Sequence, residues 1–345
     1  MTTKRPTQSD VARLAGVSRG TVSMVLNNQM DGRVPISETT RDRVLHAARE
    51  LGYAPNPVAQ MLAQGSNRLI GVFTYEPVFP YDKGNFYFPY LQGIESEASQ
   101  EDYNVLLFTR YRTSGGPHIY QNEMNSLRLA DGSILLGSNP DRDELRRLVA
   151  EEYPFVFIGR RDIPGCEISW VANNYRMGSA EALHHLLDLG HQRIGFVCNG
   201  IQLEPQQDKL DGCDEALQSA PDARLVILPE GIHQQPAELL AQVHEEGLTA
   251  LVCDSDTTFE DSLRILADAG FRVPEDVSVL CLTTPNSSYP LMIQPTYVRL
   301  NRIRLGEIAV QILNRRITST SDGVEHIYIP CELSVGETTA APNSH

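Results

Sequence analysis

The chain of 345 residues has no run of about eighteen or more apolar residues, the length that a membrane-spanning helix needs. Its first ten residues, MTTKRPTQSD, lack the apolar core of a secretion signal. We therefore expect a soluble, cytoplasmic protein with no membrane partner.

Cysteine is sparse. The six cysteines are scattered, and most of them fall inside apolar, strand-like runs: Cys166, Cys198, Cys213, Cys253, Cys281 and Cys331. This pattern is typical of reduced thiols in a core and not of a disulfide framework or a metal site. The sequence therefore predicts no bound metal and no cofactor.

Catalytic motifs are also missing. The sequence has no glycine-rich phosphate loop, no nucleophile elbow and no zinc-protease helix pattern. His184 and His185 are adjacent, so on a helix they point to different faces and cannot chelate one metal in the usual way. The carboxylates show no recognisable catalytic spacing. We expect no catalytic residues and no enzyme.

The net charge of −15, taken alone, argues against binding to nucleic acid, but the distribution of the charge along the chain reverses this inference. Residues 1–66 carry eight Lys and Arg against five Asp and Glu, a net of +3, whereas residues 67–345 carry 21 against 39, a net of −18. DNA would attract the basic part and repel the acidic one. This asymmetry indicates a nucleic-acid-binding head on an acidic body.

Residues 7–28, TQSDVARLAGVSRGTVSMVLNN, have the pattern of two short helices joined by a tight turn. Thr7 and Asp10 can cap the first helix, Gly16 supplies a left-handed turn conformation, and Ser18 can cap the second helix. The apolar positions expected to face inward are Val11, Leu14, Ala15, Val22, Val25 and Leu26, which leaves outside Arg19, Gly20, Ser23, Met24 and Asn27. Taken alone, this pattern also fits an ordinary helical hairpin.

A third helix is expected to begin at Ser37 and to end at Gly52. The arginines on its outer face are either solvated or in contact with phosphate. Residues 58–63 can form a further helix, with Asn56 as its cap and Pro57 in its first turn. Because isolated helices shorter than about 12 to 15 residues are marginal in water, we expect this segment to order only against a partner. The alternative is a plain interdomain tether.

From residue 69 onward, short apolar strands alternate with amphipathic helices, which predicts parallel sheets covered on both faces. The first series has strands at 69–74, 104–109, 133–137 and 155–159. The second begins near residue 168, with a helix at 177–189 and strands at 193–198, 224–228, 249–253 and 277–282. A helix at 301–316 and one strand at 326–335 follow. Two such subdomains imply a cleft for a small molecule beyond the strand ends.

The chain closely resembles the LacI/GalR family of bacterial transcriptional regulators from about residue 6 to 337. The segments that carry the resemblance are DVARLAGVSRGTVSMVLNN, TRDRVLHAARELGYAPNPVAQMLA, LLDLGHQRIGFV and GFRVPEDVSVL. The resemblance implies an α plus α/β fold: a three-helix helix-turn-helix DNA-binding head at 1–55, a hinge helix and linker at 56–68, and a two-lobed, periplasmic-binding-protein-like α/β effector domain at 69–340. The expected N-lobe covers about 69–165 and 299–323, and the C-lobe about 166–298 and 324–340.

The resemblance further implies a homodimer that binds a near-palindromic double-stranded DNA operator, with paired hinge helices in the minor groove and a leucine wedged into a base step. The DNA-contacting positions carried over are Thr7, Gln8, Ser9, Ser18, Arg19, Gly20, Thr21, Ser23, Met24, Asn27, Asn56, Ala59 and Leu62. Met24 stands where many members have an arginine that reads guanine, so we expect Arg19 to supply that contact.

The effector site carried over comprises Tyr75, Phe88, Asn173, Lys209, Ser255, Asp256 and Thr283. It departs from the family pattern, because Lys209 replaces an arginine, Thr283 and Thr284 replace an Asp pair, and Asn173 stands where an acidic residue is common. Aromatic residues between 75 and 90 can stack on a sugar, or they can pack the lobe or a dimer interface.

These features predict a sequence-specific DNA-binding regulator, a repressor, whose operator affinity changes when a small molecule binds between the lobes. A sugar or a related metabolite is the expected effector. The alternative is a sugar receptor with no operator-specific role.

Overall fold

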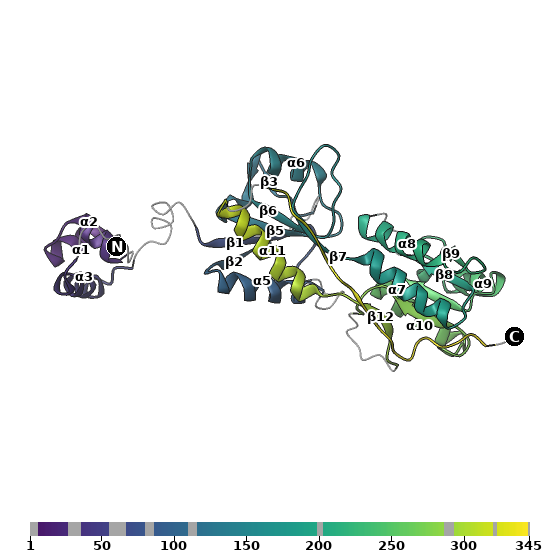
Figure 1. The fold of residues 1–345 in the computed structure, drawn as a ribbon. Helices are drawn as coiled ribbons and strands as arrows, with labels where there is room; N and C mark the ends of the chain where they lie inside the picture. The colour runs from purple at the N-terminus through teal and green to yellow at the C-terminus, as the bar shows by residue number, and fades with distance from the viewer. Residues whose placement is uncertain are drawn as a thin grey trace. The chain divides into compact units, whose positions relative to one another are not determined.

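The computed structural model describes residues 6–26, 36–54, 67–79, 86–109, 116–198, 203–285, 293–319 and 323–343. The chain divides into two compact units, Met1–Arg68 and Leu69–His345 (Figure 1). Among the described residues, no helix combines the length and the apolar character needed to cross a membrane. Five of the six cysteines are buried, which confirms that they are core thiols.

The first unit contains α1 (Gln8–Ala15), α2 (Arg19–Leu26) and α3 (Glu38–Glu50). The predicted caps are confirmed: Thr7 and Asp10 form a capping box, and Gly16 adopts a left-handed φ of 64°. The backbone N–H of Thr21 donates to Ser18 Oγ at 3.1 Å, and Ser37 caps α3. The chemistry of these few polar and glycine residues therefore defines where the helices begin and end.

Small apolar side chains form the core of this unit: Val11, Ala12, Ala15, Val22, Val25, Val44, Ala47 and Ala48. The expectation that Leu14 faces inward is wrong, because its side chain is 47% exposed. Successive residues of a helix are rotated by about 100°. The buried face of α1 is centred on Val11, Ala12 and Ala15, and this rotation places Leu14 outside it.

The first lobe of the second unit is a six-stranded parallel sheet with the order β13-β7-β6-β5-β1-β2. Its strands are β1 (Leu69–Thr74), β2 (Asn104–Phe108), β5 (Gly132–Leu136), β6 (Phe155–Ile158), β7 (Trp170–Asn173) and β13 (His326–Ile329). Helices α5 (Phe88–Gln100) and α11 (Arg302–Ile317) cover one face. The other face carries α6 (Arg142–Ala150), η1 (Ser126–Leu129) and the ribbon of β3 (Tyr120–Gln121) and β4 (Met124–Asn125).

The second lobe has the order β14-β12-β11-β10-β8-β9. Its strands are β8 (Arg193–Val197), β9 (Arg224–Ile227), β10 (Ala250–Cys253), β11 (Ser278–Cys281), β12 (Thr296–Arg299) and the antiparallel β14 (Glu332–Ser334). Helices α7 (Tyr175–Asp188) and α8 (Glu204–Leu217) cover one face. On the other lie η2 (Ile232–Gln234), α9 (Pro236–Glu245) and α10 (Asp256–Asp268).

The boundary between the lobes differs from the expected one. Residues 166–173 and 324–329 were assigned to the C-lobe, but β7 and β13 pair within the first sheet. The single strand expected at 326–335 is two strands, β13 and β14, which belong to different sheets. Pro330 separates them, because proline has no N–H to continue a ladder. The chain therefore crosses between the lobes after Asn173, between β12 and α11, and at Pro330.

A close approach of α5 and α11 depends on a missing side chain at Gly93. A Cβ at this position would lie 2.0 Å from the backbone oxygen of Ile303. We expect Gly93→Ala to lower the free energy of unfolding by about 1 to 3 kcal/mol, since α11 must move to relieve the clash. Thermal or urea unfolding measures the change. Ser96→Ala, at an exposed position of the same helix, is the control and should have little effect.

Candidate functional site

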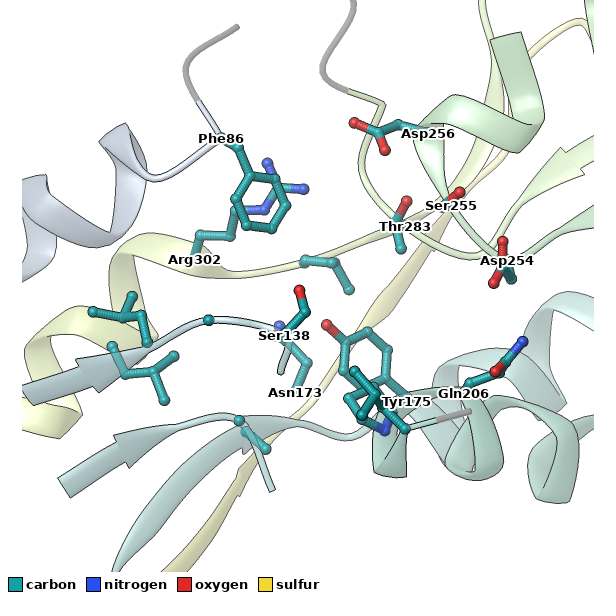
Figure 2. A pocket seen from close by; sticks show the side chains of 18 of the residues that line it. Phe86, Ser138, Asn173, Tyr175, Gln206, Asp254, Ser255, Asp256, Thr283 and Arg302 are labelled. Carbon is teal, nitrogen blue, oxygen red and sulfur yellow. The ribbon is translucent and has the colours of Figure 1, made fainter. Parts of the chain in front are cut away.

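A cavity of about 660 Å³ lies between the two lobes of the second unit (Figure 2). The first lobe contributes residues that follow β1, β5, β6 and β7, and the second contributes the first turns of α8 and α10 and the segment after β11. The carboxyl ends of parallel strands from both sheets therefore open into one space. This is the place where ligands of α/β sheets bind.

Five of the seven effector residues expected from the sequence line this cavity: Asn173, Lys209, Ser255, Asp256 and Thr283. They come from β7, α8, α10 and the segment after β11, and the two lobes bring them together. Ser255 also caps α10 by accepting a hydrogen bond from the backbone N–H of Thr258.

Tyr75 and Phe88 do not line the cavity, which corrects the sequence-based assignment. Tyr75 packs edge-on against Phe73, with ring centroids 5.0 Å apart, in the core beneath α6. Phe88 is 53% exposed at the start of α5, because the helical rotation turns Tyr87 and Tyr90 inward instead. The sequence analysis placed aromatic cavity residues in the correct segment, between residues 75 and 90, but named two residues whose rings lie outside the cavity.

The aromatic residues that do line the cavity are Phe86, Tyr87, Tyr90 and Tyr175. Tyr87 Oη donates to Glu76 Oε2 at 2.5 Å. Burial and the Glu76 carboxylate raise the pKa of Tyr87 well above its usual value, so the phenol remains a donor. Sequence reasoning noted the aromatic segment before α5 but missed Tyr175, the first residue of α7.

Lys209 is almost completely buried in the cavity wall, with 7% of its surface exposed. Its Nζ donates to the backbone oxygen of Asp254 at 2.5 Å and lies 4.9 Å from the centre of the Tyr175 ring. Burial lowers the pKa of Lys209 below its ordinary value, while the nearby Asp254 carboxylate raises it. Lys209 thus joins α8 to the carboxyl end of β10 at the edge of the ligand space.

Arg302 is a cavity residue that sequence reasoning missed. It is the first residue of α11 and is 6% exposed. Its Nη2 donates to the backbone oxygen of Thr284 at 3.3 Å, and its guanidinium carbon lies 4.7 Å from the centre of the Phe86 ring. The one available signal was its position after Asn301, which caps a helix that directly follows a strand.

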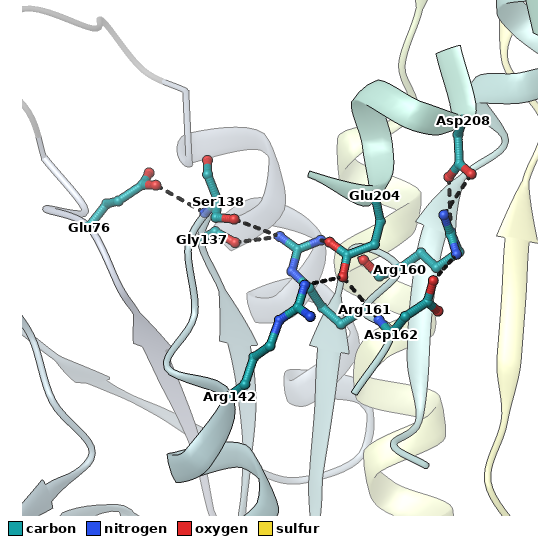
Figure 3. A network of polar contacts seen from close by, with 9 residues as sticks. All are labelled: Glu76, Gly137, Ser138, Arg142, Arg160, Arg161, Asp162, Glu204 and Asp208. Atoms are coloured by element: carbon teal, nitrogen blue, oxygen red, sulfur yellow. Dashed lines mark hydrogen bonds and ion pairs between the residues drawn. The ribbon is translucent and has the colours of Figure 1, made fainter. Parts of the chain in front are cut away.

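Ion pairs connect the two lobes beside the cavity (Figure 3). Arg160, in the segment after β6, donates from Nε and Nη2 to the two oxygens of Asp208 on α8 at 3.1 and 2.9 Å. Arg142 on α6 donates to Glu204 on α8 at 2.8 Å, and the backbone N–H of Asp162 donates to the same carboxylate at 3.1 Å. The structure thus fastens the start of α8 to the first lobe, a feature with no sequence signature.

One group among the described residues has metal-like spacing: His118, Asp141 and Glu144. The Glu144 carboxylate already accepts hydrogen bonds from the backbone N–H groups of Ile119 and Tyr120, at 3.1 and 3.2 Å. Asp141 caps α6 through two backbone N–H groups. These bonds explain both carboxylates as structural groups.

The head presents the predicted DNA-contacting residues at its surface. Thr7, Ser9, Ser18, Arg19 and Gly20 are exposed. The partly exposed positions are Gln8, Thr21, Ser23 and Met24. The remaining predicted positions, Asn27, Asn56, Ala59 and Leu62, lie outside the described residues.

A helix-turn-helix unit followed by two lobes around a cavity defines a DNA-binding regulator with a ligand-binding body. Comparisons with known proteins agree with this class. Residues 7–56 match the description "Bacterial regulatory proteins, lacI family", and residues 183–339 match "Periplasmic binding protein-like domain".

The relatives cover most of the chain. The transcriptional regulator GalR of Escherichia coli (strain K12) is 30% identical over 79% of this chain and 78% of its own length. The transcriptional repressor PurR of Haemophilus influenzae (strain PittEE) is 28% identical over 92% and 93%. A crystal structure of the lac repressor dimer bound to operator and the anti-inducer ONPF has a TM-score of 0.76 at 25% identity, covering 98% of this chain and 100% of that one. The chain belongs to the LacI family of bacterial regulatory proteins and is a DNA-binding transcriptional regulator, not an enzyme.

The pair of Arg160 and Asp208 should couple energetically. Both side chains are mostly buried, at 19% and 12% exposure, and they share two hydrogen bonds. We expect a double-mutant cycle of Arg160→Ala and Asp208→Ala, followed by urea unfolding, to give a coupling energy of about 1 to 3 kcal/mol. The exposed pair of Arg272 and Asp276 is the control and should give less than about 1 kcal/mol. Equal coupling in the two cycles would contradict the interlobe role.

Proposed function

We propose that this regulator is a dimeric repressor whose operator affinity changes when a small molecule binds between the lobes of its body. The observation that carries the proposal is the cavity of about 660 Å³ whose walls come from both lobes. A ligand that contacts both walls stabilises one arrangement of the lobes over others. By linkage, any arrangement that alters DNA binding then makes the ligand an effector.

The relatives support each part of this proposal. PurR is named a repressor, and the lac repressor structure is a dimer on its operator with a bound anti-inducer. A complex of the transcriptional regulator CelR with cellobiose has a TM-score of 0.65 at 25% identity over 97% of this chain. For the present chain we propose a homodimer in the cytoplasm, a near-palindromic operator and a carbohydrate-like effector.

The proposed division of labour follows the chain. Residues 1–55 bind DNA, 56–68 form the linker, and 69–340 bind the effector and the second subunit. On the head, the exposed start of α2 with Arg19 and Gly20 faces the major groove. In the linker, Asn56, Ala59 and Leu62 are proposed to order on the minor groove.

Arg19 is proposed to read a base. We expect Arg19→Ala to weaken binding to the selected operator by about 1 to 3 kcal/mol and to relax the preference at one base pair. The operator is first selected from random duplexes with the full-length protein, and affinities are then measured by fluorescence anisotropy. Arg13→Ala, which removes the same charge from an exposed side chain on α1, is the control. An equal loss on operator and random DNA would show that Arg19 contacts only phosphate.

Leu62 is proposed to wedge into the operator, so Leu62→Ala should lower operator affinity while ligand affinity stays unchanged. Operator binding is measured by anisotropy and ligand binding by calorimetry on the same preparations. If Leu62→Ala bound the operator with normal affinity, the proposal that Leu62 wedges into the operator would be contradicted. If the wild-type protein binds ligand but selects no specific duplex at any salt concentration, the chain is a receptor without an operator role.

A further inference from the structure

The guanidinium of Arg302 is buried in the wall of the cavity, and within the described part of the chain no carboxylate forms an ion pair with it. Arg302 is 6% exposed, and no Asp or Glu of the described residues lies within 4.0 Å of it. Its Nε is buried and has no hydrogen-bond partner among those residues. Its guanidinium donates a hydrogen bond to the Thr284 carbonyl, shares a side-chain hydrogen bond with Tyr90 and lies against the face of Phe86.

A second buried arginine that lines the cavity, Arg161, shows how such a charge is balanced elsewhere. Arg161 is 7% exposed, donates to the Gly137 carbonyl at 2.7 Å, and has the Glu204 carboxylate at 4.0 Å. Arg302 likewise donates to a carbonyl, but none of the carboxylates that the structure describes pairs with it. A buried ion without a counter-ion is costly, and a guanidinium matches planar or tetrahedral anions through its fork of donors. Arg302 therefore offers an incomplete anion site that faces the ligand space.

Charged groups of both signs line this space, with Arg302 and Glu76 on the side of the first lobe and Lys209, Asp254 and Asp256 on the side of the second. Figure 2 shows Arg302 on the side of the first lobe, and Asp254 and Ser255 on the side of the second. Asp256 and Thr283 lie on that second side too. Carboxylates and hydroxyls of this kind accept or exchange hydrogen bonds with ligand hydroxyls. A ligand with an anionic group against Arg302 would place its other end against the hydroxyls and carboxylates of this second side.

The segment after β11 lacks the carboxylates that would repel an anion near Arg302. Thr283 lines the cavity there, and Thr284 holds Arg302 through its carbonyl. The Oγ1 of Thr284 also accepts a hydrogen bond from the backbone N–H of Leu300 at 2.7 Å. Thr284 belongs to the second lobe and Arg302 to the first, so an anion on Arg302 binds beside a junction of the lobes.

We propose that the effector is an anionic carbohydrate, a sugar bearing a carboxylate or a phosphate, whose anion binds Arg302 and whose hydroxyls face Asp254, Ser255 and Thr283. The rings of Phe86, Tyr90 and Tyr175 provide apolar surface for its carbon skeleton. This inference rests on the proposed function, in which the same cavity is the effector site.

The test uses matched ligands on the full-length protein. Galactose, galacturonate and galactose 6-phosphate form one set, glucose, glucuronate and glucose 6-phosphate a second, and cellobiose is a neutral disaccharide. Calorimetry should show at least one acid binding about tenfold or more tightly than its neutral parent, the effect expected for a hydrogen bond to a charged group. The comparison within each set distinguishes a carboxylate from a phosphate.

Variants then assign the effect to Arg302. Arg302→Met should weaken binding of that acid by about tenfold or more and leave the neutral sugar unchanged, and Arg302→Lys should retain part of the affinity because it keeps the charge but loses the fork. Arg316→Met is the matched control: Arg316 lies on the same helix, its Nε is also buried without a partner, and it does not line the cavity. Circular dichroism melts show whether each variant is folded. If Arg302→Met is not folded, Arg302→Lys alone decides.

The outcomes are separable. Tighter binding of a neutral sugar than of its acids, or equal loss in the Arg302 and Arg316 variants, overturns the anionic class and leaves the cavity as an effector site. Undiminished acid binding in Arg302→Met or Arg302→Lys overturns it as well. Absence of binding by every acid and every neutral sugar contradicts both this inference and the proposed carbohydrate effector.

Discussion

The three chain crossings between the lobes are the constraint on which the body depends. They lie after Asn173, between β12 and α11, and at Pro330, and hydrogen bonds tie them together. The backbone N–H of Asn301 donates to Asn173 Oδ1 at 3.3 Å, and that of Asn174 donates to the Ile329 carbonyl at 2.8 Å. The lobes therefore cannot slide independently. Side chains at the crossings face both the junction and the cavity, so a ligand there acts on the relative position of the lobes.

The ion pairs on α8 add a second connection at the other side of the cavity. Glu204 and Asp208 are nearly buried, and each is held by an arginine of the first lobe. If the lobes separated there, water would solvate the four charged groups, which reduces the net stabilisation that the ion pairs contribute. The pairs still favour one specific geometry of the two lobes. The crossings and the ion pairs thus connect the two lobes at separate places. In the proposed mechanism, a ligand that binds one arrangement of the lobes more tightly than another shifts the population toward it.

Local chemistry explains what the sequence predicted well. Caps at Thr7, Ser18 and Ser37 depend on a side chain and the next few N–H groups, so spacing alone reveals them. Continuous apolar runs likewise defined eight strands to within a residue or two, whereas β7 and β12 were not predicted. The predictions that failed concern side chains whose orientation depends on packing against residues far away in the sequence. Ala12 is buried and Leu14 is exposed because α1 packs against α3 through Ala12. Tyr87 and Tyr90 face inward because α5 packs against the sheet and α11, whereas Tyr75 packs with Phe73 on the opposite face of the sheet.

Arg302 illustrates why the site was the hardest part to predict, and why net charge is a poor guide to ligand charge. Residues 67–345 carry a net charge of −18, which taken as a whole would repel an anion. Yet exposed carboxylates are screened within about 8 Å at physiological ionic strength. A guanidinium that is 6% exposed is screened far less, because protein surrounds it in place of water. The proposed anion site therefore depends on a local environment, and that environment exists only after two distant segments, 283–284 and 302, have been brought together by the fold.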